Sequence, residues 1–168
     1  MIQWLSQTAF FVWLSQTLLG KMFAVLIVSM LPLIELRGAI PLGEVFGLHY
    51  AVSFLVAFVG NMLPIPFVIL FIKRILAWVK EHMPHLGGVV RWLEKKAHKN
   101  SEVVLKYEKW GLFILVAIPL PGTGAWTGAL VASFFDMKLK DSLPVIALGV
   151  LAAGLIVAGV TQLVAFFV

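Results

Sequence analysis

Long apolar stretches alternate along the chain with short stretches rich in proline, glycine or charge. Residues 50–72 are 23 successive uncharged residues, which is enough for one helix to cross a bilayer. Residues 142–168 form a second apolar stretch of similar length. We predict a transmembrane helix for each of them. Pro64 and Pro66 predict a kink in the first one, because proline removes a helical hydrogen bond.

Two shorter apolar runs, residues 22–31 and 110–120, cannot cross the membrane as helices. The first has ten residues, so its helix would be about 15 Å long, half of the hydrocarbon layer of about 30 Å. Each run ends in a turn rich in proline and glycine, and a second run then returns. Irregular backbone at this depth is tolerated only inside protein or beside a water-filled cavity. We therefore predict a re-entrant helical hairpin at each place.

The order of a hairpin followed by a span occurs twice along the chain. Placing Pro32 on Pro119 aligns the two copies with an offset of 87 residues. The predicted fold is an all-α polytopic membrane protein with a single membrane domain, residues 1–168. Its predicted parts are an N-terminal amphipathic or transmembrane helix, repeat 1, a basic amphipathic helical linker and repeat 2, at residues 1–21, 22–72, 73–109 and 110–168.

Charged residues concentrate in the linker. Residues 73–109 hold nine of the thirteen basic residues and four acidic ones, which accounts for the whole net charge of +5. Short basic loops beside membrane spans face the cytoplasm, so we predict a cytoplasmic linker. The first hairpin then enters from outside and the second from the cytoplasm, which makes the repeat an inverted one. Only 12% of the residues are charged, against about 25% in soluble domains, which is typical of an integral membrane protein. Because the basic linker is flanked by membrane spans, nucleic acid is not an expected partner.

Several kinds of chemistry are disfavoured by the residue content. There is no cysteine, which excludes disulfides and thiolate metal sites. The spacing of His82, His85 and His98 matches no metal site. Since there is also no phosphate-binding loop and no nucleophile–base motif, we expect neither an enzyme nor a cofactor.

The candidate site is the place where the two hairpin tips would meet, at the membrane midplane. Secondary transporters built from inverted repeats bind substrate at such broken helices. The guanidinium of Arg37 suits phosphate or carboxylate, and Glu35 would carry a coupling proton. The helix starts after each turn would add positive dipole ends. The predicted substrate or proton site comprises Glu35, Arg37, Gly38, Asn61, Pro119, Pro121, Gly122, Thr123, Gly124 and Thr127.

These residues also have a purely structural interpretation. Glu35 and Arg37 could neutralise each other and lock the hairpin. Asn61, halfway along the first span, could bond a neighbouring helix. The turn at residues 119–124 could need its prolines and glycines for its shape alone. We prefer the functional interpretation for Glu35 and Arg37, because ionisable residues inside a membrane are costly.

Three stretches resemble the small multidrug export family of bacteria and archaea, at residues 32–43, 60–66 and 119–129. The resemblance covers about residues 20–165 and implies a small transporter in the inner (plasma) membrane of a prokaryote. That family is similar in plan to the DedA-like transporter superfamily, some members of which are implicated in proton-coupled return of undecaprenyl phosphate. The resemblance places Glu35 and Arg37 on the acidic-x-Arg feature of DedA-like proteins. Their second hairpin carries an arginine, whereas this chain has none between Lys109 and Lys138.

The first functional hypothesis is a proton-coupled carrier of an amphipathic anion such as a lipid phosphate. The alternatives are an exporter of cationic amphipathic drugs, in which Glu35 would bind the substrate, and a non-transporting membrane scaffold. An Arg37→Gln change separates the first two, because it should abolish binding of an anion but not of a cation. The expected partners are membrane lipids, protons, a small amphipathic substrate and a second copy of the chain in a homodimer.

Overall fold

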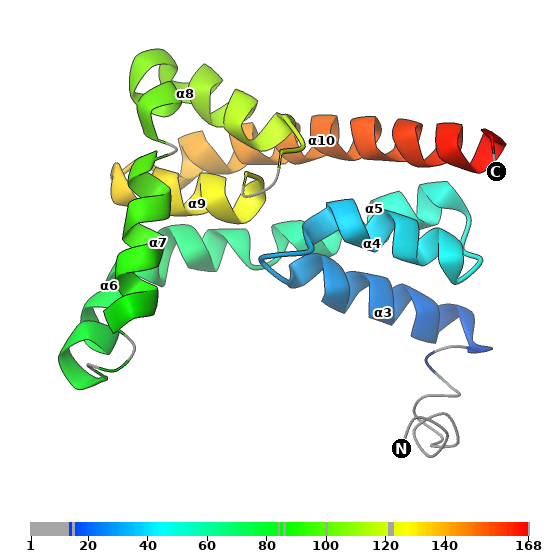
Figure 1. Cartoon of the computed structure of the whole chain (residues 1–168), viewed down its shortest axis with the longest axis horizontal. Helices are drawn as coiled ribbons and strands as arrows, with labels where there is room; N and C mark the ends of the chain where they lie inside the picture. Colours follow the sequence, from blue (N-terminus) through cyan, green and yellow to red (C-terminus); the bar gives the residue numbers. More distant parts are fainter. Residues whose placement is uncertain are drawn as a thin grey trace. The chain divides into compact units, whose positions relative to one another are not determined.

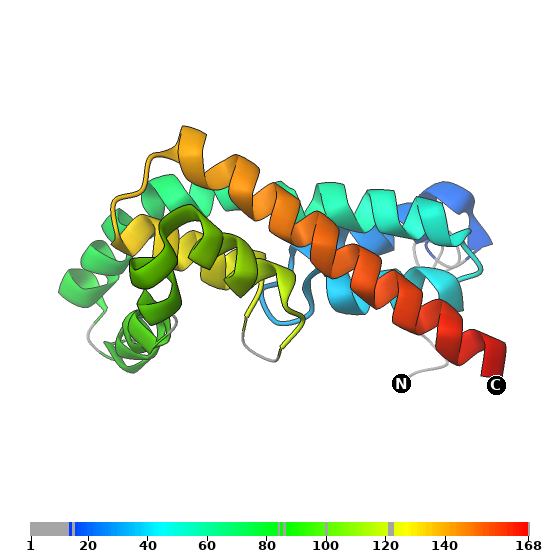
Figure 2. The same cartoon turned by 90° about the horizontal axis from the view of Figure 1, so that it is seen from above.

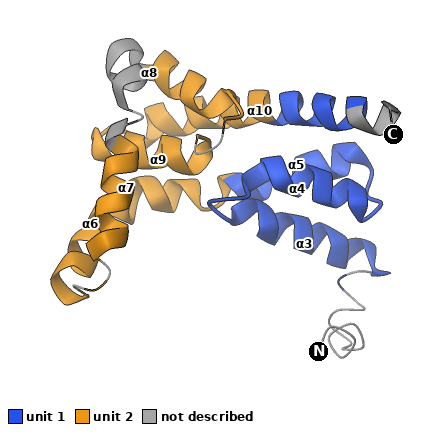
Figure 3. Ribbon diagram, viewed as in Figure 1, with its two compact units in different colours: residues 1–61, 154–168 blue, residues 62–153 orange. Residues whose placement is uncertain are grey.

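The computed structural model is all-helical, and its described part contains no strand (Figure 1). The residues it describes are 14, 16–83, 85, 87–99, 101–120 and 123–167. Most of the predicted N-terminal helix, residues 1–21, lies outside them. The chain forms two compact units, which are described one at a time (Figure 3). The first comprises residues 1–61 and 154–168, and the second comprises residues 62–153.

The first unit begins with a helical hairpin. Its arms are α3 (Leu18–Met30) and α4 (Glu35–Val45), which pack against each other across a turn of four residues, 31–34. Pro32 lies in the turn, where a residue without an N–H cannot continue α3. α3 begins four residues before the predicted run because the Thr17 side chain accepts a hydrogen bond from the Gly20 N–H at 3.0 Å. Two packed helices therefore lie where the first re-entrant hairpin was predicted, with a longer first arm; entry into a membrane stays a prediction.

Small residues let the helices of the first unit approach closely. A Cβ added at Gly60, in α5 (Tyr50–Met62), would meet the Ser29 hydroxyl and the Leu26 carbonyl oxygen of α3. A Cβ added at Gly43 would lie 2.7 Å from the Ser53 Cβ, where α4 faces α5. This is the packing that membrane helices use, since apolar burial does not drive helices together in lipid.

The second unit is built around α9 (Ala125–Phe134), which is buried along most of its length. α9 packs against α6 (Ile65–His82), α7 (Gly87–Lys99) and α8 (Ser101–Ala117). A Cβ added at Gly128 would lie 2.6 Å from a methyl group of Val116, so only glycine allows α8 this close to α9. α8 and α9 pack against each other where the second hairpin was predicted, and residues 118–124 connect them.

Two long apolar helices are sufficient in length and composition to cross a membrane: Tyr50–His82 and Leu139–Leu163. The first is broken between α5 and α6 at Leu63 and Pro64, which confirms the predicted kink. The second belongs to α10 (Leu139–Phe167), which is one continuous helix (Figure 2).

The predicted linker, residues 73–109, is helical over almost all of its described part. The apolar helix α6 continues through the amphipathic stretch after Ile72 to His82. α7 follows at Gly87–Lys99, and α8 covers Ser101–Ala117. The basic residues up to Lys109 therefore continue directly into the second hairpin.

The returning arms of the two hairpins end in the same capping motif. Gly47 after α4 and Asp136 after α9 both have positive φ, +74° and +52°. At α4 the Leu48 N–H bonds the Gly43 carbonyl at 2.9 Å, and at α9 Met137 bonds Ala132 at the same distance. Both are Schellman caps. Aligning the two caps places Gly47 on Asp136, which is an offset of 89 residues along the sequence. The offset predicted from the prolines was 87. The difference arises because the second turn is longer than the first.

Candidate functional site

Glu35 and Arg37 lie in the first turn of α4, directly after the proline turn. The Glu35 side chain is buried, with 5% of its surface exposed, and Arg37 is half-buried. Glu35 also has φ +53°, in the left-handed region that costs a residue with a Cβ about 1–2 kcal/mol. A strained backbone and a buried carboxylate at one position are typical of a functional site.

The starts of the returning helices lack side-chain caps. Ile34 at α4 and Gly124 at α9 make no side-chain capping bond, whereas Thr17 caps α3. Gly38, one turn into α4, packs directly on the Ile34 side chain. Uncapped helix starts point N–H groups and a positive dipole end at whatever lies beyond them. Each returning arm is therefore suited to an anion at its N-terminus.

Asn61 is almost fully buried, with 1% of its surface exposed. Among the described residues, neither atom of its amide has a hydrogen-bond partner. The alternative that this amide bonds a neighbouring helix therefore finds no support in the described part of the chain. A buried amide without partners is costly, and such a group commonly bonds water or a ligand.

The second turn contains the remaining predicted residues. Pro121 and Gly122 lie outside the described residues, and Pro119 lies in the turn. The Thr123 hydroxyl lies 2.9 Å from the Ile118 carbonyl and 2.8 Å from the Leu120 carbonyl, so it stabilises the turn itself. This favours the structural interpretation for Thr123.

The predicted site residues fall into two groups, one in each unit. In the second unit, Gly124 adopts φ +130°, which only glycine tolerates readily. Thr127 lies within α9 and is almost fully buried, with 2% of its surface exposed. The first unit contains Glu35, Arg37, Gly38 and Asn61, and the second contains Pro119, Thr123, Gly124 and Thr127.

Comparison with known proteins gives one match. The family described as "Putative small multi-drug export protein" matches residues 35–156, which is most of the chain. This chain belongs to that family. The comparisons with curated proteins and with solved structures gave no match. The family match and the two long apolar helices together identify a membrane protein.

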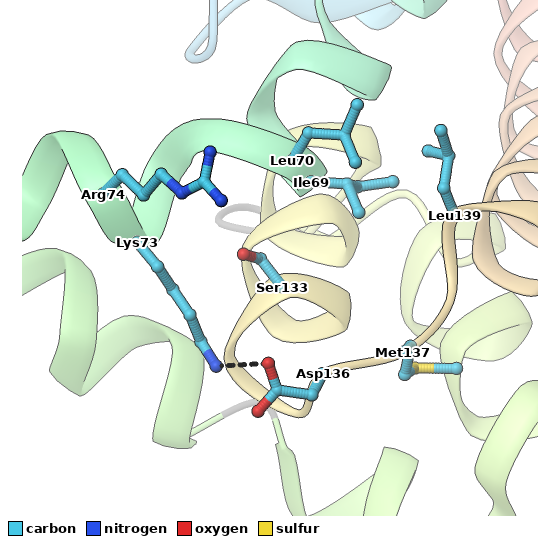
Figure 4. Close-up of a pocket in the computed structure, with 8 residues that line it drawn as sticks. All are labelled: Ile69, Leu70, Lys73, Arg74, Ser133, Asp136, Met137 and Leu139. Carbon is cyan, nitrogen blue, oxygen red and sulfur yellow. Dashed lines mark hydrogen bonds and ion pairs between the residues drawn. The ribbon is translucent and has the colours of Figure 1, made fainter.

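The matched region begins at Glu35, so it includes every predicted site residue. It also includes a pocket that the sequence did not reveal, between α6 and α9 (Figure 4). An ion pair lies there, with the Lys73 ammonium 2.8 Å from the Asp136 carboxylate. The sequence shows that Lys73 directly follows the apolar run and that Asp136 lies in a predicted surface segment. Because the two residues are far apart in the chain, the sequence does not show that they form an ion pair.

Within the described ranges, no group of three or more His, Asp or Glu side chains is placed to hold a metal ion. The first unit contains the buried carboxyl of Glu35, the Arg37 guanidinium, the Asn61 amide and the uncapped start of α4, which are groups suited to reversible binding of a charged molecule. The second unit contains the uncapped start of α9.

Proposed function

We propose that this protein is a proton-coupled carrier of an amphipathic anion such as a lipid phosphate. The buried Glu35 at the uncapped start of α4, two residues before Arg37, carries the proposal. Arg37 and the uncapped N-terminus of α4 would bind the anion, and Glu35 would exchange the proton. Protonation of Glu35 leaves Arg37 as the uncompensated charge of the pair, which strengthens anion binding.

The proposal includes two hairpins that enter the membrane from opposite sides. α3 has 13 residues and α9 has 10, so they are about 20 Å and 15 Å long, less than the hydrocarbon thickness of about 30 Å. The shared Schellman caps support a repeated unit. The basic segment between the repeats would lie in the cytoplasm of a prokaryotic cell, which gives the two repeats inverted orientations.

A second candidate is export of a cationic amphipathic drug. The family description and the burial of the Glu35 carboxylate favour it. Here Glu35 would bind substrate and proton alternately, and Arg37 would tune its charge. The two candidates predict opposite effects of removing Arg37.

Flux into proteoliposomes, with and without an imposed pH gradient, tests the proposal. The probes are a fluorescent polyprenyl phosphate and a cationic dye. We expect Arg37→Gln to lower flux of the phosphate by about 10–100-fold, because one charge-assisted contact is lost. We expect Glu35→Gln to remove the effect of the pH gradient. Glu44→Gln, which removes the other acid of α4, is the matched control and should leave flux unchanged.

Each outcome of this experiment distinguishes the candidates. If Arg37→Gln transports the dye as well as or better than wild type, while wild type does not transport the phosphate, cation export is correct. If no variant changes the flux of either probe, the carrier proposal is wrong and a scaffold role follows.

A further inference from the structure

The pocket between α6 and α9 has a charged side and an apolar side. Its volume is about 330 Å³. In Figure 4 the polar ends of Arg74, Lys73, Ser133 and Asp136 lie on one side, and apolar side chains that include Leu139 lie on the other. Ligand pockets for drug-sized molecules span about 300–1,000 Å³, so this one fits a small headgroup better than a whole drug.

The charged side of the pocket carries a net positive charge. Lys73 and Asp136 neutralise each other, with 2.8 Å between the ammonium and the carboxylate. Arg74 is exposed and makes no ion pair with any described residue. Its guanidinium is turned toward the side of Ser133 (Figure 4). One arginine therefore remains for an anionic ligand, and arginine binds phosphate oxygens in a two-pronged geometry.

The lengths of both apolar helices predict that this pocket lies at the depth of the lipid headgroups. Lys73 and Arg74 follow the last apolar residues that a span starting at Tyr50 needs, since about 20 residues cross the hydrocarbon layer. The other apolar helix begins at Leu139, on the opposite wall of the pocket. The first charged residues after the apolar stretch of one helix and the start of the other helix thus both line the pocket, with the charged side chains where headgroups would lie.

We propose that this pocket binds the phosphate of an anionic phospholipid. Arg74 would hold the phosphate oxygens, the Ser133 hydroxyl would donate to them, and an acyl chain would leave over Leu70 and Leu139. This lipid is a bound partner and not the transported molecule, so the proposal does not depend on the carrier function. A lipid held here would link α6 and α9 to the headgroup layer, where basic side chains attract anionic lipids.

Native mass spectrometry of the full chain in neutral detergent, titrated with phosphatidylglycerol, tests the proposal. We expect Arg74→Gln to weaken lipid binding about tenfold, through loss of one charge-assisted contact. Asp136→Asn should strengthen binding, because it releases Lys73 to face the phosphate, and asparagine accepts the positive φ of this position. Arg91→Gln, which removes an exposed arginine of α7, is the control and should change affinity less than twofold.

Comparison lipids and a soluble anion define the ligand. Phosphatidylcholine, which has the phosphate but no net charge, should bind less tightly than phosphatidylglycerol. If the two bind equally, or if Arg74→Gln and Arg91→Gln weaken binding alike, the proposal is wrong. If inorganic phosphate displaces phosphatidylglycerol at equal concentration, the pocket is a site for free phosphate and not for lipid. Thermal unfolding of each variant shows that it is folded, and transport is measured separately.

Discussion

A Glu35→Gly variant is expected to fold at least as stably as the wild type and to lose most of its transport. Glu35 has φ +53°, which glycine adopts without the strain of about 1–2 kcal/mol that a residue with a Cβ carries. The same change removes the carboxyl group that we propose to carry the proton. We expect flux under a pH gradient to fall about 10–100-fold. Unfolding by SDS in mixed micelles and proteoliposome flux measure the two effects on one protein.

The matched variant Glu35→Gln separates the two causes. Glutamine keeps the side chain and the backbone strain but cannot titrate, so it should lose the pH-dependent flux without the gain in stability. If Glu35→Gly transports as the wild type does, Glu35 carries no proton. If Glu35→Gly is much less stable than Glu35→Gln, its side chain locks the hairpin and the structural interpretation is correct.

Gly60→Ala is expected to lower the free energy of unfolding by about 1–3 kcal/mol, which is the usual effect of overpacking. A Cβ at this position would lie 2.5 Å from the Leu26 carbonyl oxygen, and it would also contact the Ser29 hydroxyl. The carbonyl belongs to the backbone of α3, so it cannot move aside as a flexible side chain would. The first unit must then separate α3 from α5. SDS unfolding in mixed micelles measures the loss.

Gly159→Ala in α10 is the control for this prediction. No atom lies within 4 Å of a Cβ added there, so the change should be neutral or stabilising by up to about 1 kcal/mol, as alanine favours helices over glycine. Equal destabilisation by the two variants would show that close approach of α3 and α5 does not hold the first unit together.

Much of the helical plan was readable from the sequence. Apolar run length located both long helices, and Pro64 located the break in the first one. Pro32 located the first turn, because proline prevents continuation of a helix. The start of α3 was less accurately predicted, since it depends on the single side chain of Thr17, which caps the helix. The sequence also did not show that α6 and α8 would extend from the repeats into the linker.

The candidate site was only partly readable. Glu35 and Arg37 were conspicuous because charge is rare in an apolar run, but nothing in the sequence indicates a positive φ at Glu35. The sequence also gives no indication of the pocket, whose ion pair joins Lys73 and Asp136. A contact over that distance follows from packing of α6 on α9, which periodicity along the chain does not encode. The sequence also did not show that the Thr123 hydroxyl bonds carbonyl groups of its own turn.

The direction from which each turn enters the membrane tests the central claim most directly. The chain has no cysteine, so a maleimide labels only a cysteine that is introduced. Single cysteines are introduced in place of four exposed residues: Leu33, Leu120, His49 and Lys95. With a membrane-impermeant maleimide, His49→Cys and Lys95→Cys should react from opposite faces. Leu33→Cys should react slowly and only from the His49 face, and Leu120→Cys only from the Lys95 face. Reaction of both turns from one face would contradict the inverted pair of hairpins and the carrier built on it.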